Sequence, residues 1–382
     1  MLDSGYSTLF PVVPKTYDLV SWDPRGMGYS TPYADCGLQK LFQKSKRAYG
    51  LSGPDVSDKY YENVFQTAAA VGKLCQANIG GVDQAGPHMS TPVVVRDMIS
   101  ILDAFAETEQ GKSVDSPKDI NYWGFSYGSV LGQTFASMFP DRVGRFAMDG
   151  IEDPEDYYNA DGFDIVYNVD AVFDLFFEYC FQAGPALCTF HIGTSSKDIK
   201  RRFLDLFANF QVGQAYAKKW DNSTLLDDSL GSIMSIIRPM TYTPVTGFPK
   251  LAQTLIAYEN ALKNLTLDNI EAAGQIAAPV QADIPGHKPD LSEWTFAVLC
   301  PDSGNRLLDK TLDDYRLSNK KIAEQSYIGH VGISSIKIFC SGWSIEAKEK
   351  FTGALCINIY ICMKLTLYRY FWSCYEKPHT IY

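Results

Sequence analysis

Residues 120–129 constrain the fold more than any other stretch, because an apolar run there leads into the pattern Gly-x-Ser-x-Gly. The run predicts a strand, and residues 130–139 predict a helix that ends before Pro140. A serine in a tight turn between a strand and a helix is typical of a nucleophile elbow. Such a turn strains the serine backbone and holds the hydroxyl clear of the sheet. We therefore predict that Ser126 is a nucleophile.

The residues around Ser126 have predicted roles of their own. A Cβ at Gly124 or Gly128 is expected to collide where the strand and the helix pass closely. The N–H groups of the first helical turn point toward the place where an oxyanion would form, so the Tyr127 N–H is the predicted oxyanion donor. The alternative is a buried serine in a glycine-rich turn with no chemical role.

Helices and strands alternate on both sides of this motif. Residues 17–22 predict a buried strand, and residues 58–77 and 91–105 predict helices. A further strand is predicted at residues 143–148, with Asp149 at its end. This order predicts an α/β fold with a mostly parallel sheet that helices cover on both faces.

From Ile151 onward the pattern changes to helices joined by loops. These helices are predicted at residues 170–180, 197–210, 248–262 and 311–326. We interpret the change as a helical lid inserted into the sheet domain. The predicted domains are a core at 1–153, the lid at 154–336, a return to the core at 337–353 and an aberrant tail at 354–382.

Composition excludes several classes of partner and cofactor. The net charge of −10 disfavours binding to a phosphate backbone, so no nucleic-acid partner is expected. The sequence contains no Cys-x-x-Cys or His-x-x-x-His spacing and no glycine-rich phosphate loop at a helix start. We therefore expect no metal and no cofactor.

Cysteines and sequons point to a secretory route. Of the nine cysteines, six lie before residue 354, and sequence does not fix their pairing. Nearness along the chain suggests the pairs Cys36 with Cys75, Cys180 with Cys188, and Cys300 with Cys340. Asn222 and Asn264 begin glycosylation sequons, which agrees with secretion. The first four residues do not begin a signal peptide.

Four blocks carry a resemblance to a known family. They are residues 17–30, 122–129, 148–154 and 340–343, with 347–351 following the last block. Together and in this order they resemble the α/β-hydrolase family of prolyl and tripeptidyl aminopeptidases, particularly the secreted microbial type. The resemblance runs from about Tyr17 to Gly353. It implies an α/β-hydrolase fold, Ser126 as the nucleophile and the N-terminal end of a peptide as the substrate.

The sequence departs from that family at its C-terminal end. Related enzymes place the triad acid and histidine in a strand–helix–strand section beyond residues 342–343, and only residues 354–382 remain after the resemblance ends. This tail has no Asp, and its one histidine is His379. Lys364 and Arg369 interrupt its apolar run, so no membrane span is expected. We interpret the tail as translation outside the ancestral reading, with the last strands of the sheet missing.

The N-terminal end also departs from the family, and the sequence does not settle which residues are the acid and the base of the triad. The family carries a glycine-rich oxyanion loop upstream of residue 17, and only Ser4 and Gly5 resemble it. His330, within Gly-His-Val-Gly, and Asp149 are the candidates for base and acid, with His379 a weaker one. Asp149 has a second interpretation, as a residue that braces its turn.

Two sets of charged residues each have two competing interpretations. Asp23 and Arg25 either line the site or brace their loop. The cluster of Glu152, Asp153, Glu155 and Asp156 either binds a substrate amine or forms a solvated acidic loop, and the second interpretation is favoured by the usual exposure of carboxylates.

The predicted function is a serine hydrolase, in particular a peptidase that releases N-terminal residues or short peptides through an acyl-enzyme on Ser126. An esterase or lipase would use the same chemistry. A third possibility is a truncated, non-catalytic product, because a serine without its base loses most of its activity.

Overall fold

The computed structural model describes residues 13, 17–38, 58–160, 162, 164–217, 237, 240–241, 243–264, 266, 268–269, 272–273, 276, 293–304, 306–308, 310–328 and 337–353. They fall into two compact units. The sheet unit comprises Thr91–Tyr158 and the described residues from Glu349, and the helical unit comprises the described residues up to Ser90 and those of Asn159–Lys348. The predicted domain boundaries at 153, 336 and 353 stay predictions.

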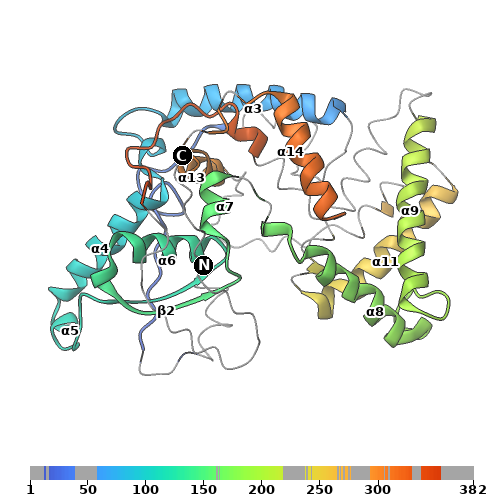
Figure 1. Ribbon diagram of the computed structural model, residues 1–382, viewed down its shortest axis with the longest axis horizontal. Coiled ribbons are helices and arrows are strands. Elements are labelled where there is room, and N and C mark those ends of the chain that lie inside the picture. The colour runs from blue at the N-terminus through green and yellow to red at the C-terminus, as the bar shows by residue number, and fades with distance from the viewer. Residues whose placement is uncertain are drawn as a thin grey trace, which may run out of the picture. The chain divides into compact units, whose positions relative to one another are not determined.

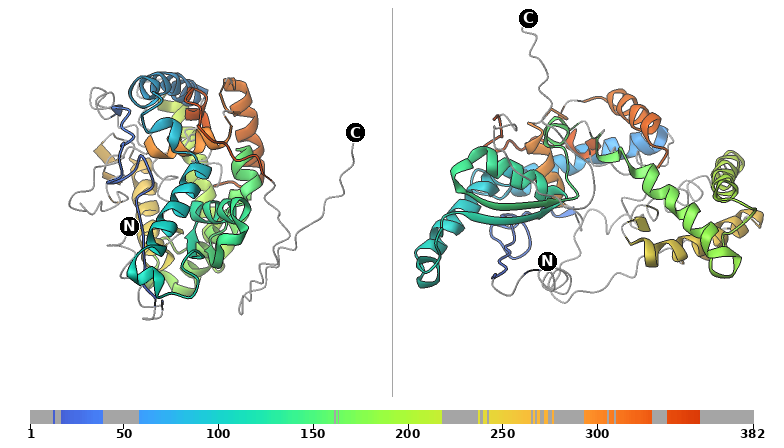
Figure 2. Two further views of the ribbon diagram at one scale, coloured as in Figure 1. Left: turned by 90° about the vertical axis from the view of Figure 1, so that its left-hand side faces the viewer. Right: turned by 60° about the horizontal axis from the view of Figure 1, so that its bottom comes forward.

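The sheet unit is built on a strand–helix–strand motif. Strand β1 (Ile120–Phe125) and strand β2 (Val143–Asp149) are parallel, and Gly124 pairs with Met148 in their register. Helix α6 (Tyr127–Met138) and the short 3-10 helix η2 (Pro140–Arg142) connect them. Figures 1 and 2 show α6 lying along the strands. Both strand predictions are confirmed, and α6 begins three residues earlier than predicted, directly after the turn at Ser126.

Aromatic packing holds α6 on the sheet. The ring of Phe135, which is fully buried, lies 5.7 Å from the Phe146 ring, and Phe146 lies 5.3 Å from Tyr122. Helix α4 (Thr91–Ala106) packs against α6, and α5 (Glu109–Lys112) follows it. Side chains of β1 alternate in exposure, and those of Trp123 and Phe125 face outward. Within the described residues, helices therefore cover one face of the sheet, not the two that were predicted.

The strand predicted at residues 17–22 is wrong. These residues have no regular secondary structure, and Val20 is 74% exposed. A strand needs a neighbour for its backbone hydrogen bonds, and no such pairing is found among the described residues. In the loop that follows, the Asp23 carboxylate accepts a 3.0 Å hydrogen bond from the Tyr29 N–H, which fits the bracing interpretation.

The helical unit consists of helices and loops in its described part. Its helices are α3 (Asp58–Ile79), η1 (Gly86–His88), η3 (Asp164–Val166), α8 (Val169–Leu187), α9 (Ser196–Ala217), α11 (Pro244–Lys263), α13 (Glu293–Asp302) and α14 (Leu312–Gln325). The division of the chain into two units falls within helix α7 (Pro154–Asn159), after Tyr158. The predicted helices are confirmed, with shifted ends. Helix α13 was not predicted, because its residues 294–300 are almost all apolar and show no helical periodicity.

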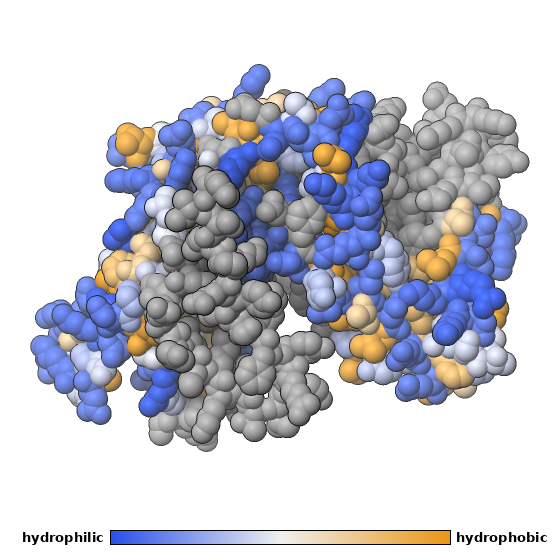
Figure 3. All heavy atoms as spheres, viewed as in Figure 1, coloured by the Kyte–Doolittle hydropathy of each residue, from blue (hydrophilic) through white to orange (hydrophobic). Residues whose placement is uncertain are grey.

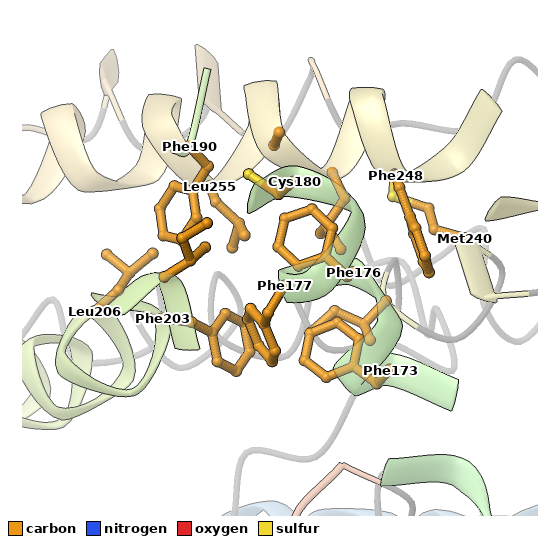
Figure 4. Close-up of a cluster of buried hydrophobic side chains, with 14 of the residues drawn as sticks. Phe173, Phe176, Phe177, Cys180, Phe190, Phe203, Leu206, Met240, Phe248 and Leu255 are labelled. Atoms are coloured by element: carbon orange, nitrogen blue, oxygen red, sulfur yellow. The ribbon is translucent and has the colours of Figure 1, made fainter. Parts of the chain in front are cut away.

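Helices α8, α9 and α11 share one hydrophobic core. Figure 4 shows Phe173, Phe176 and Phe177 of α8 gathered with Phe203 of α9 and Phe248 of α11. The ring centroids of Phe173 and Phe203 are 5.1 Å apart, and those of Phe176 and Phe248 are 5.5 Å apart. These aromatic rings therefore form the core that joins the three helices.

A second set of contacts joins α8 to the segment after α14. The Asp170 carboxylate accepts hydrogen bonds from the Ser326 hydroxyl at 2.6 Å and the Tyr327 N–H at 3.0 Å. The Tyr327 hydroxyl donates to Asp174 at 2.9 Å, and burial and that carboxylate raise the Tyr327 pKa. These bonds connect residues more than 150 positions apart in the sequence.

Three disulfides join the six cysteines that precede residue 354. They are Cys36–Cys75, Cys180–Cys188 and Cys300–Cys340, as nearness along the chain suggested. The sequon residue Asn264 is exposed at the end of α11, whereas Asn222 lies outside the described residues. Among the described helices, none has the length and apolar character needed to cross a membrane.

The surface drawn in Figure 3 is mostly hydrophilic where it is coloured, with hydrophobic residues in small groups. Exposed hydrophobic side chains such as Leu187 and Val245 lie far apart in the sequence. Isolated exposed apolar side chains are ordinary on folded proteins.

The ion pair between Arg202 and Glu259 leads to a prediction about acid stability. Two hydrogen bonds of 3.0 and 2.6 Å join the groups, and both side chains are about one fifth exposed. The hydrogen bonds from Arg202 hold the Glu259 pKa below its usual value of 4.5. A depressed pKa stabilises the fold above the unfolded-state pKa, and this contribution is lost as the pH falls through the folded-state pKa.

We expect Glu259→Gln to lower the free energy of unfolding by about 2 kcal/mol near neutral pH, the usual loss for a hydrogen bond to a charged group. The difference from wild type should vanish in acid, once Glu259 is protonated. Urea unfolding at several pH values measures this. Glu178→Gln, which removes an exposed carboxylate from α8, is the control. A difference that does not change with pH would contradict the assignment.

Candidate functional site

Ser126 occupies a strained turn between β1 and α6. Its backbone angles are φ 55° and ψ −125°, a region that residues other than glycine rarely adopt. The Ser126 N–H donates to the Asp149 carbonyl at 3.2 Å, and its own carbonyl accepts from the Ser129 N–H at 2.7 Å. The strained conformation expected of a nucleophile elbow is confirmed, and the serine is exposed.

The two glycines of the motif differ in what surrounds them. A Cβ on Gly124 would lie 2.5 Å from the Gly128 carbonyl oxygen and 2.6 Å from the Tyr122 ring. On Gly128 it would meet only the Tyr122 hydroxyl, at 3.2 Å. The expected collision is therefore confirmed for Gly124. For Gly128 it is reduced to a tight contact with the end of a side chain.

Tyr122 connects the strand to the start of the helix. Its hydroxyl donates to the Gly128 carbonyl at 2.7 Å. Burial raises the pKa of Tyr122 to about 12, so the hydroxyl stays protonated and remains a donor at any ordinary pH. This bond fixes the first turn of α6 against β1.

The Ser126 hydroxyl donates to a carboxylate. Its Oγ lies 3.0 Å from Oε1 of Glu152. Glu152 is half-buried and comes three residues after the end of β2. The solvated-loop interpretation therefore does not describe Glu152, whose carboxylate is at the candidate nucleophile.

The backbone of Glu152 is attached to α6. Its N–H donates to the Ser129 hydroxyl at 2.9 Å, and its carbonyl accepts from the Gln133 side chain at 3.3 Å. The hydroxyl of Ser129, a buried residue, also donates to the Ser126 carbonyl at 2.7 Å. Ser129 thus connects the turn at Ser126 to the loop that carries Glu152.

The sequence contained a signal for this contact. Glu152 and Ser126 each follow one of two strands, and the carboxyl ends of neighbouring parallel strands lie at the same edge of a sheet. The next carboxylate, Asp153, has a different role, because it accepts from the N–H groups of Glu155 and Asp156 at 2.7 and 3.1 Å. It caps the start of α7.

Asp149 lies beside the turn, at the end of β2. Its carboxylate accepts a 2.7 Å hydrogen bond from the indole N–H of Trp123. Its carbonyl accepts the Ser126 N–H. Both contacts fit the bracing interpretation, and a role as the triad acid stays a prediction.

Tyr127, the predicted oxyanion donor, is the first residue of α6 and follows Ser126 directly. Its hydroxyl is 2.6 Å from the Thr91 hydroxyl, and its ring lies 5.8 Å from the Tyr157 ring. Neighbouring side chains thus contact both the hydroxyl and the ring of Tyr127. The role of its N–H as the oxyanion donor stays a prediction.

The candidate bases His330 and His379 lie outside the described residues. His88 has its ring nitrogen 2.8 Å from the Val82 carbonyl, and His191 stacks on Phe181 with ring centroids 5.8 Å apart. In the described part of the chain, no group of three His, Cys, Asp or Glu residues is arranged to hold a metal ion.

Comparison with known proteins gives two results. Residues 2–231 match the family described as alpha/beta hydrolase fold. A "Tripeptidyl aminopeptidase" from Streptomyces lividans is 33% identical over 148 residues, which are 39% of this chain and 24% of the relative. "Serine protease Hip1" from Mycobacterium tuberculosis is 29% identical over 164 residues, 41% of this chain and 26% of the relative. The matches therefore span about a quarter of the length of these relatives.

Proposed function

Because this chain belongs to the α/β-hydrolase fold family, we propose that it is a serine peptidase that acts at the N-terminal end of peptides. The observation that carries this proposal is Ser126, exposed in a strained turn between a parallel strand and a helix start. The proposal is further supported by the two relatives, whose names describe a serine protease and a tripeptidyl aminopeptidase.

In the proposed reaction, the Ser126 Oγ attacks the carbonyl carbon of the scissile bond. The oxygen becomes negatively charged, and the Tyr127 N–H donates to it. The C–N bond then breaks, the amine leaves with a proton from the base, and an ester on Ser126 remains. Water hydrolyses this ester and restores the serine.

The base and acid of this mechanism are part of the proposal. His330 is the proposed base and Asp149 a proposed acid. A serine hydroxyl is a weak nucleophile without a base, so the rate of its modification reports whether a base is present.

A fluorophosphonate probe tests the function on the purified full-length chain. We expect the probe to label one site, and we expect Ser126→Ala to abolish the labelling. Heat-denatured protein is the control for non-specific reaction. No labelling of folded protein would overturn the proposal.

The same probe tests the proposed base. His330→Ala should slow labelling by several orders of magnitude, as removal of a base from a serine enzyme does. His88→Ala is the matched control.

Turnover of aminoacyl or tripeptidyl arylamides would favour a peptidase, whereas turnover of acyl esters alone would favour an esterase.

We also propose that the protein is secreted and glycosylated. Three disulfides are typical of proteins from oxidising compartments. The exposed Asn264 is accessible to glycosylation. Mass spectrometry of the secreted protein, before and after deglycosylation, would test both statements.

A further inference from the structure

Glu152 is fixed beside the nucleophile by the fold. Its backbone is bonded on one side to Ser129 and on the other to Gln133, and both residues belong to α6. Its carboxylate accepts from the Ser126 hydroxyl at 3.0 Å. A substrate whose carbonyl carbon reaches Ser126 therefore brings its neighbouring atoms close to this carboxylate.

A carboxylate at this position has an electrostatic consequence. Negative charge develops on the substrate oxygen during attack, and a second negative charge nearby opposes it. A cationic group on the substrate, between the carboxylate and the reacting carbonyl, removes this repulsion and forms a charge-assisted hydrogen bond with Glu152. Neutral substrates gain no such bond.

Bond lengths limit where on the substrate that cation can be. Within one residue, the α-nitrogen and the carbonyl carbon are about 2.5 Å apart. Each further residue of extended chain adds about 3.5 Å, so the α-nitrogen of a tripeptide lies about 7 Å farther from the scissile carbonyl. A carboxylate in contact with Ser126 can therefore reach the α-nitrogen of the residue that supplies the scissile carbonyl. It cannot reach the α-nitrogen at the start of a tripeptide.

We propose that Glu152 determines specificity by binding an ammonium group on the residue that supplies the scissile carbonyl. This inference rests on the proposed function. An α-ammonium at that residue corresponds to release of single N-terminal residues. The side-chain ammonium of a lysine at the same residue is a second source of this cationic group.

Diphenyl phosphonate analogues of amino acids distinguish these sources. Ser126 Oγ forms a bond to phosphorus, a P–O bond to one phenyl group breaks, and phenol leaves with the serine proton. Three probes are compared: an alanine analogue with a free amine, its N-acetyl derivative, and an Nα-acetyl lysine analogue with a free side chain.

We expect the free-amine alanine probe to label about 10- to 100-fold faster than its acetyl derivative, the range typical of a hydrogen bond to a charged group. In Glu152→Gln this ratio should fall to about 1. Glu155→Gln, which removes an equal charge from the exposed first turn of α7, should leave it unchanged. A preference for the acetyl lysine probe would identify the side chain as the source.

The ratio separates specificity from structural damage, because misfolding would slow all three probes together. The neutral fluorophosphonate probe is run in parallel on each variant. If it labels Ser126 while the ratio is near 1 in wild type, or is the same in Glu152→Gln, the inference about Glu152 is overturned and the proposed function stands. If it does not label wild type, both are overturned.

Discussion

Replacing Gly72 with alanine is expected to unfold the helical unit at much lower denaturant concentration than wild type. Gly72 lies on α3, and a Cβ there would overlap the backbone carbonyl of Gly342. A Cβ on Gly342 would in turn overlap the backbone of Ala68, one helical turn earlier. The helix and the turn at Gly342 therefore touch backbone to backbone.

The turn at Gly342 is held on both sides. Cys340 is joined by a disulfide to Cys300, and Trp343 is almost fully buried. The new methyl group can then be accommodated only by a shift of backbone. This explains in physical terms why the block at 340–343, which carried part of the family resemblance, contains a glycine.

The size of the effect follows from two opposing contributions. Alanine is favoured over glycine in a helix by about 1 kcal/mol. Overpacking against a rigid neighbour costs about 3 kcal/mol or more, so the net effect is destabilising. Urea unfolding followed by far-UV circular dichroism measures it, with Ala70→Ser on the exposed side of α3 as the control. Equal midpoints for the two variants would show that the close approach is absent.

The second large effect is expected at Gly124. A Cβ there meets the Gly128 carbonyl at 2.5 Å, which is backbone and cannot rotate away. The turn at Ser126 must then move relative to β1. A misplacement of about 1 Å in a catalytic group can cost about 100-fold in rate, so Gly124→Ala should slow fluorophosphonate labelling by about 100-fold or more.

Gly128→Ala is the matched comparison for Gly124→Ala. Both change a glycine of the same motif to alanine, but the methyl group at 128 meets only the Tyr122 hydroxyl at 3.2 Å. A small movement of that side chain relieves the contact, so we expect less than a 10-fold loss of labelling, within the cost of one perturbed hydrogen bond. Equal losses in the two variants would contradict this account of the turn.

Some features could be predicted from sequence because they depend on near neighbours. The run of apolar residues before Ser126 predicted the strand β1, which begins at Ile120, and the motif predicted the strained turn. The cysteines paired with the nearest partners available along the chain. The strand and the turn depend on interactions within a short stretch of chain, where residue type and spacing carry most of the information.

The tertiary structure decided the rest. Residues 17–22 have the composition of a strand but no strand neighbour in the described part of the chain, and a strand cannot form without one. Gly72 and Gly342 are 270 positions apart, and only packing shows that they touch. Glu152 reaches Ser126 because the register of β1 on β2 brings their ends together. Sequence alone determined that this protein has a serine at a nucleophile elbow. The folded chain decided which carboxylate lies beside it, because that contact depends on how the two strands align.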